Sequence, residues 1–132
     1  MVNIMKKILT FLVTASVAVS AYAGEFTDVN INEVKKLAES KSAVIIDVNG
    51  DDSFKVGHVP GALNFAAIRE NLALNLPKKK DALIIAYCGN PKCGAYLKAA
   101  KAAEKLGYTN IKHMSAGISG WKAAGMKTEP GS

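Results

Sequence analysis

The sequence predicts a single α/β domain, a three-layer sandwich in which helices cover both faces of a mostly parallel sheet. Two runs of consecutive apolar, largely β-branched residues, at 43–46 and 83–87, are typical of strands that are buried on both faces. Segments with the apolar spacing of helices separate these runs, and strands that alternate with helices pair in parallel. The length of 132 residues suits one such domain and hardly two.

The N-terminal segment differs in pattern from the rest of the chain. Two lysines precede an apolar run at 8–19, and Ala21 and Ala23 stand at the small positions of a cleavage site. The run is too short to span a bilayer, which takes about 20 apolar residues. We therefore expect a cleavable signal peptide over 1–23 and a periplasmic or secreted domain over 24–132, without stable membrane insertion after cleavage.

The mature chain begins with a predicted helix that Asp28 or Asn30 can cap. Its apolar side consists of Ile31, Val34, Leu37 and Ala38. The buried strand at 43–46 follows it. Turn-forming residues occupy 49–52, and a second, tighter break occupies 57–61.

Two further elements precede the second buried strand. Residues 62–65 are compatible with a short strand, and residues 66–76 with a helix. The apolar side of that helix consists of Ile68, Leu72 and Leu76. The strand at 83–87 then leads directly into a loop that contains glycine and proline.

The C-terminal third is predicted as helix, strand and helix. The first helix covers about 95–106, and Gly107 ends it as a left-handed cap. Residues 110–114 form a third strand. A last short helix over 118–124 ends before Gly125.

The charge of the mature chain is mildly basic and spread out. Without the two lysines of the signal segment, 15 basic and 11 acidic residues leave a net charge of +4. The densest basic run, at 78–80, has no aromatic residues interleaved with it, so a solvated loop is the simplest interpretation. We expect no nucleic-acid partner.

The chemically informative residue is Cys88, which directly follows the strand at 83–87. The loop after it consists of Gly89, Asn90, Pro91, Lys92, Cys93 and Gly94. Ligands of parallel sheets bind at the carboxyl ends of strands, and loop amides in front of a helix N-terminus form a cradle for anions. We expect the cradle to hold Cys88 as a thiolate, with Lys92 adding positive charge at the rim. A passively buried cysteine is the alternative, but such a loop is a poor place for passive packing.

From about residue 25 to the C-terminus, the sequence resembles the rhodanese-like domain. The matching pieces are the strand end at 44–47, the stretch at 57–64, Tyr87 with Cys88 and its loop, residues 106–108, and Gly117 with Gly120 and Trp121. The resemblance implies a rhodanese-like sandwich and, since the cysteine is present, sulfur transfer through a persulfide on Cys88. The loop departs from the common family pattern at Pro91 and Cys93. Asn49 and Ser53 stand where family members often have Arg and Glu.

We expect a thiosulfate sulfurtransferase-like enzyme. A small donor such as thiosulfate or a persulfide would load Cys88 with sulfane sulfur, which then passes to a thiol or cyanide. Whether a protein also accepts the sulfur stays open. No cofactor is expected, and Cys-x4-Cys without paired histidines is a poor metal site. Two alternatives remain: a thiol–disulfide or sulfur-relay protein in which Cys93 is the redox partner of Cys88, and a non-catalytic binding module.

The other polar candidates are assigned structural roles. His58 is expected to fix a turn, His113 to be a strand residue, and Asp47 to organise neighbouring backbone amides. Trp121 is expected to pack the last helix onto the sheet. For Cys93 we expect a position near Cys88, because the loop must curl for its amides to converge on one sulfur; whether the pair forms a disulfide stays open.

Overall fold

Five strands form the central sheet of the computed structural model, which describes residues 26–131. The strands are β1 (Thr27–Asp28), β2 (Val44–Asp47), β3 (Leu63–Asn64), β4 (Ile84–Tyr87) and β5 (Ile111–His113). They lie in the order β1-β5-β4-β2-β3, and each neighbouring pair is parallel. The expected signal peptide at 1–23 and its cleavage site lie outside the described residues.

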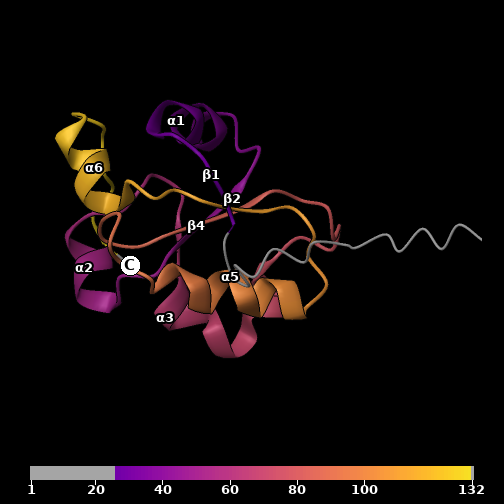
Figure 1. Cartoon of the computed structure of the whole chain (residues 1–132). Coiled ribbons are helices and arrows are strands. Elements are labelled where there is room, and N and C mark those ends of the chain that lie inside the picture. The colour runs from indigo at the N-terminus through magenta and orange to yellow at the C-terminus, as the bar shows by residue number, and fades with distance from the viewer. Residues whose placement is uncertain (1–25, 132) are drawn as a thin grey trace, which may run out of the picture.

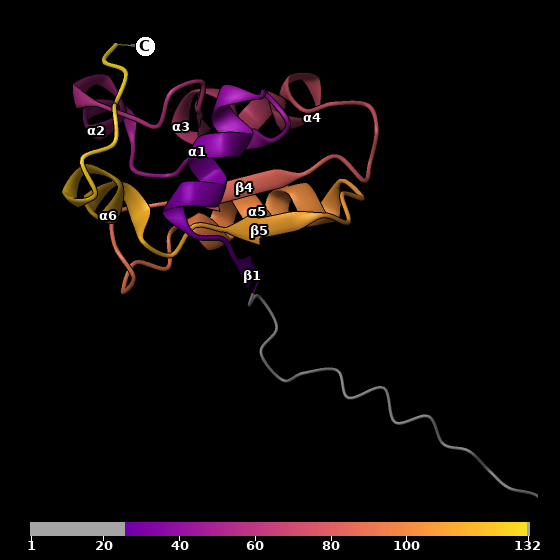
Figure 2. The same cartoon turned by 90° about the horizontal axis from the view of Figure 1, so that it is seen from above.

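Helices cover both faces of this sheet (Figures 1 and 2). One face carries α1 (Ile31–Glu39) and α6 (Gly117–Ala123). The other face carries α5 (Tyr96–Lys105) and the short segments α3 (Phe65–Ile68), η1 (Arg69–Asn71) and α4 (Leu72–Asn75). In both views α2 (Asp51–Val56) and α6 lie at the same end of the molecule. The predicted α/β sandwich is confirmed.

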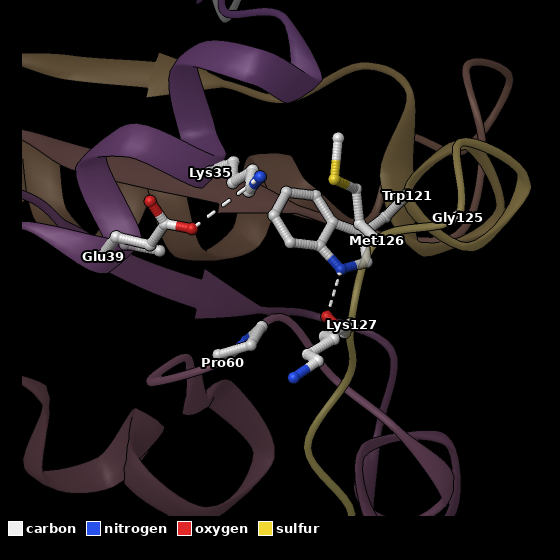
Figure 3. A pocket seen from close by; sticks show the side chains of 8 residues that line it. Lys35, Glu39, Pro60, Trp121, Gly125, Met126 and Lys127 are labelled. Carbon is white, nitrogen blue, oxygen red and sulfur yellow. Dashed lines mark hydrogen bonds and ion pairs between the residues drawn. The ribbon is translucent and has the colours of Figure 1, made fainter.

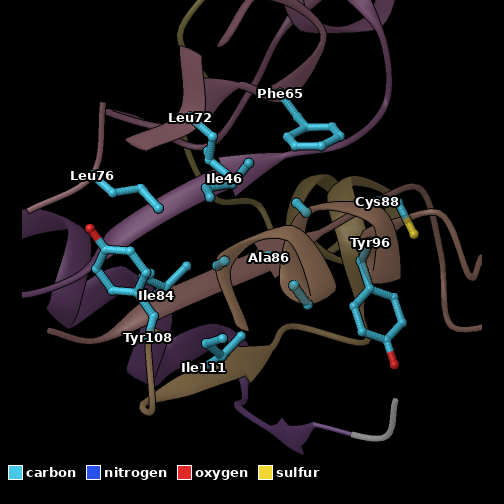
Figure 4. Close-up of a cluster of buried hydrophobic side chains, with 13 residues drawn as sticks. Ile46, Phe65, Leu72, Leu76, Ile84, Ala86, Cys88, Tyr96, Tyr108 and Ile111 are labelled. Carbon is cyan, nitrogen blue, oxygen red and sulfur yellow. The ribbon is translucent and has the colours of Figure 1, made fainter. Parts of the chain in front are cut away.

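Alternating side chains of β4 divide the core into two clusters, as the period of a strand requires. Ile84 and Ala86 pack with side chains of α3, α4 and α5 (Figure 4). Ile85 and Tyr87 pack on the opposite face with side chains of α1, α2 and α6. Cys88 continues the alternation and belongs to the α5 side. The residue after β4 is therefore held by the core on one face of the sheet.

The predicted caps of α1 and α5 agree with the structure. The Asn30 side chain caps α1 by accepting a hydrogen bond of 2.9 Å from the Glu33 amide. Asp28, the other candidate, instead accepts the Ser115 amide at 2.8 Å. Gly107 follows α5 with a positive φ of 96°, the left-handed conformation expected of a helix cap.

Two predictions of secondary structure need correction, and one short strand was missed. The helix predicted over 66–76 is broken, because the backbone leaves helical geometry at Asn71, with φ −121° and ψ 29°. The Asn71 carbonyl there accepts the Asn75 side chain at 2.9 Å, and asparagine competes in this way with helical hydrogen bonds. The turn at 49–52 runs into α2, whose Phe54 is buried in the core. β1 was not predicted, since two residues are too few for a periodic pattern.

Membrane-spanning helices are not found in the described part of the chain. Within residues 26–131, each helix is too short or too polar to cross a bilayer.

Candidate active site

Cys88 lies at the carboxyl end of β4 and is almost completely buried, with 1% of its surface exposed. Its Sγ donates a hydrogen bond to the Cys93 carbonyl oxygen at 3.2 Å. Figure 4 draws Cys88 and Tyr96, the first residue of α5, together at one end of the core cluster. The predicted position, between a buried strand and the start of a helix, is confirmed.

The loop after Cys88 is curled by the Asn90 residue. The Asn90 carbonyl accepts the Cys93 amide at 3.0 Å, and its side-chain oxygen accepts the Lys92 amide at 2.9 Å. Lys92 is exposed at the loop surface. This turn brings Cys93 back toward Cys88.

The N-terminal end of α6 holds the beginning of the same loop. The Ile118 amide donates to the Cys88 carbonyl and the Ser119 amide donates to the Gly89 carbonyl, both at 2.9 Å. Gly117 permits this approach, because a Cβ atom there would lie 2.5 Å from the carbonyl carbon of Gly89. The glycines around Ile118 were the only sequence signal for this contact, and sequence reasoning did not assign it.

Burial raises the pKa of Cys88 to about 11. Its hydrogen bond and charge interaction with Cys93 also raise this pKa, whereas the backbone amides of Tyr96 and Gly89 act to lower it. The loop amides are thus directed at the sulfur as predicted. The predicted resting thiolate is wrong, because removal of the sulfur from water outweighs the two amides.

Cys93 has the more acidic thiol of the pair. Burial by itself would raise its pKa, but the hydrogen bond from Cys88 and the amides of Gly89 and Ala95 lower it below the ordinary value. Cys93 is partly exposed, and both cysteines are free thiols. The predicted proximity of the two cysteines is confirmed, since Cys88 Sγ lies 3.2 Å from the Cys93 carbonyl oxygen and the two thiols interact.

A buried network connects the ends of β2 and β4. The Tyr87 hydroxyl donates to Asp47 at 2.6 Å and accepts the Val59 amide at 3.0 Å. Asp47 also accepts the Asn49 amide at 2.8 Å, which agrees with its predicted role in organising the backbone. Burial raises the pKa of Tyr87, and the Asp47 carboxylate raises it further. The hydroxyl therefore remains protonated and supports the strand ends beneath the loop.

The two histidines have structural contacts. His58 Nδ1 donates to the Phe54 carbonyl at 2.8 Å, and the His58 ring stacks on that of Phe54. His113 ends β5, and its ring stacks on that of Tyr96. Burial lowers the pKa of His113, whereas the charge of Asp28 acts to raise it. Over residues 26–131, no group of three or more metal-binding side chains comes together.

A surface cavity of about 440 Å³ lies beside α1 and the end of α6 (Figure 3). Trp121 contributes one wall, and its indole N–H donates to the Lys127 carbonyl at 2.7 Å. The other lining residues are Lys35, Ala38, Glu39, Pro60, Gly125 and Met126. Trp121 is itself buried in the core, as predicted, and the cavity contains no residue of the cysteine loop.

Comparison with known proteins identifies the domain type. A family model described as the rhodanese-like domain matches residues 30–124. The chain is 29% identical over 101 residues to the HTH-type transcriptional regulator Rv0324 of Mycobacterium tuberculosis, covering 75% of this chain. It spans only 43% of that regulator's length.

A second relative and a solved structure match over most of their own length. The chain is 27% identical over 105 residues to thiosulfate sulfurtransferase GlpE of Shewanella oneidensis, covering 75% of this chain and 95% of the relative. The crystal structure of the BH2092 protein from Bacillus halodurans has the same fold, with a TM-score of 0.68 at 24% identity. That match covers 79% of this chain and 77% of the other.

Proposed function

Because this chain belongs to the rhodanese-like domain family, we propose that it is a sulfurtransferase that carries sulfane sulfur as a persulfide on Cys88. The similarity to a thiosulfate sulfurtransferase supports sulfur transfer in general. The observation that carries the specific proposal is the position of Cys88 at the end of β4, with the amides of Gly89 and Tyr96 directed at its sulfur.

The proposed reaction has two steps. Cys88 loses its proton to solvent and attacks the sulfane sulfur of a donor such as thiosulfate. A bond forms from Cys88 Sγ to that sulfur, while the donor's S–S bond breaks and sulfite leaves with the electron pair. A thiol or cyanide acceptor then attacks the outer sulfur, and the Cys88 thiolate leaves. Amides around the loop stabilise the anionic sulfur in both steps.

The test compares the wild-type protein with Cys88→Ser after treatment with thiosulfate. Mass spectrometry of samples trapped with iodoacetamide soon after mixing should show one added sulfur on Cys88 of the wild type and none on the variant. Thiocyanate formation from cyanide should fall to background in the variant, whose circular dichroism should be unchanged because serine is nearly isosteric. Transfer by Cys88→Ser at a near wild-type rate would contradict the proposal.

We also propose that the protein acts outside the cytoplasm after removal of residues 1–23. The proposal is supported by the order of lysines, short apolar run and small residues in that segment. The sulfur donor would then be one that is present in the periplasm or outside the cell.

A further inference from the structure

Two free thiols interact within one short loop. Cys88 Sγ donates to the Cys93 carbonyl at 3.2 Å, and the Cys93 amide donates to the Asn90 carbonyl at 3.0 Å, so the chain curls back onto its first residue. Cys93 is partly exposed, whereas Cys88 is buried. A persulfide on Cys88 would therefore form beside a second thiol.

We propose that Cys93 discharges the Cys88 persulfide as hydrogen sulfide, so that the protein reduces sulfane sulfur at the expense of an external dithiol. This inference rests on the proposed function, because it begins with a loaded Cys88. It requires the Cys93 thiolate to reach Cys88 Sγ. The described loop places that Sγ 3.2 Å from the Cys93 carbonyl oxygen, and the two thiols interact through a side-chain hydrogen bond.

The discharge step is a thiol–disulfide exchange with a defined leaving group. The Cys93 thiolate attacks Cys88 Sγ, and a Cys88–Cys93 disulfide forms. The bond between Sγ and the outer sulfur breaks, and that sulfur leaves with the electron pair and takes a proton from solvent to become hydrosulfide. The outer sulfur is thereby reduced, and the two cysteines are oxidised.

Regeneration requires a dithiol reductant, which exchanges twice with the Cys88–Cys93 disulfide and leaves as its own disulfide. With thiosulfate as donor, one thiosulfate and one dithiol give sulfite, hydrogen sulfide and the oxidised dithiol. A disulfide between residues in one short loop constrains little of the chain, so its reduction should be easy.

The electrostatics of the loop favour Cys93 as the attacking group. In the unloaded loop its pKa is lowered by the side-chain hydrogen bond with the Cys88 thiol and by the amides of Gly89 and Ala95, against the effect of burial. The two amides do not depend on the Cys88 proton, so they also favour the Cys93 thiolate when Cys88 carries sulfur. A larger thiolate fraction at neutral pH increases the rate of attack on a neighbouring sulfur.

The experiment uses the full chain, first reduced and then freed of reductant in the absence of air. One equivalent of thiosulfate is added to the wild type, Cys93→Ala and Cys93→Ser, and sulfide and intact mass are followed. The wild type should release sulfide and end lighter than the reduced protein by two hydrogen atoms. Both variants should keep one added sulfur and release sulfide at least about tenfold more slowly, because an intramolecular thiol has a high effective concentration.

The outcomes separate this inference from the proposed function. If the wild type keeps its persulfide and releases sulfide no faster than the two variants, the inference is overturned while the proposed function stands. If peptide mapping finds the added sulfur on Cys93, the thiol relays sulfur instead of discharging it, and the inference is also overturned. If no protein gains sulfur on Cys88, both the proposed function and the inference fail.

Discussion

At Cys88, burial and the backbone hydrogen bonds act in opposite directions on the pKa of the thiol. The amides of Gly89 and Tyr96 favour the Cys88 thiolate, but the loss of water and the neighbouring Cys93 favour the thiol, and the net effect is a pKa of about 11. Below that pKa the thiolate fraction is small. Cys93, which has more contact with solvent and a lowered pKa, ionises first.

This difference predicts separate pH profiles for alkylation of the two cysteines. The rate at Cys88 should rise about tenfold per pH unit through the alkaline range up to pH 11, because only the thiolate reacts. The rate at Cys93 should level off below the ordinary thiol pKa of 9.0. Iodoacetamide labelling followed by peptide mass spectrometry measures both rates. A plateau for Cys88 below pH 9.0 would show that the loop stabilises its thiolate at rest.

The same pKa shift links Cys88 to stability. Its folded-state pKa is raised above the ordinary value of 9.0, so the unfolded chain loses this proton at a lower pH than the folded chain. The contribution to the free energy of unfolding is therefore complete below pH 9.0 and declines as the pH rises toward about 11.

Among the elements, α6 has the most direct effect on the site. Its first amides bind the carbonyls of Cys88 and Gly89, and they come from a segment about thirty residues later in the chain. α6 is also anchored by Trp121, which is buried among the side chains of α1 and α2. The geometry of the cysteine loop therefore depends on how the last helix packs.

Gly117→Ala should disturb the cysteine loop, and Gly125→Ala is its matched control. Both glycines have positive φ, 64° and 75°, so alanine costs about 1–2 kcal/mol at either position. At Gly117 the new methyl group would also lie 2.5 Å from the Gly89 carbonyl carbon, whereas at Gly125 no neighbour lies within 4 Å. Gly117→Ala should therefore be the less stable variant and should load less sulfur on Cys88.

The measurements are urea unfolding and thiosulfate loading of both variants. Gly125→Ala should load Cys88 as the wild type does, because it changes only the backbone strain after α6. Equal stability and equal loading of the two variants would mean that the close contact between Gly117 and the loop does not matter for the site.

On the scale of the whole molecule, the parallel sheet brings the ends of β2 and β4 together. Asp47, Tyr87 and Cys88 meet at that edge although about forty residues separate the two strands. Between the helices on the two faces, the Cys88 side chain lies in the core, and the Cys88 carbonyl accepts a hydrogen bond from the first turn of α6. The packed sheet and helices thus hold the loop at 88–94 from both faces.

The N-terminal residue of the recovered protein tests the proposed export. Protein recovered from outside the cytoplasm should begin at Gly24, because Ala21 and Ala23 stand at the small-residue positions of the proposed cleavage site. N-terminal sequencing makes the measurement. The control replaces Ala23 by a bulky residue, which should slow processing at this position. Recovery of the intact Met1 form from the soluble cytoplasm would contradict export.

Much of the architecture was predictable because its causes are local. The strands at 43–46 and 83–87 are marked by their own apolar residues, whatever they pack against. Asn30 caps α1 with its own side chain, and the left-handed conformation of Gly107 depends only on the end of α5. The position of Cys88 directly after a buried strand was also readable from neighbouring residues.

The remaining features depend on contacts between segments that are distant in sequence. The raised pKa of Cys88 reflects its burial in the folded core and the curl that returns Cys93 to it. β1 exists because Thr27 and Asp28 pair with β5, more than eighty residues later. Local sequence patterns do not show which distant segments come into contact, since the desolvation of Cys88 and the pairing of β1 with β5 arise only when the whole chain has packed.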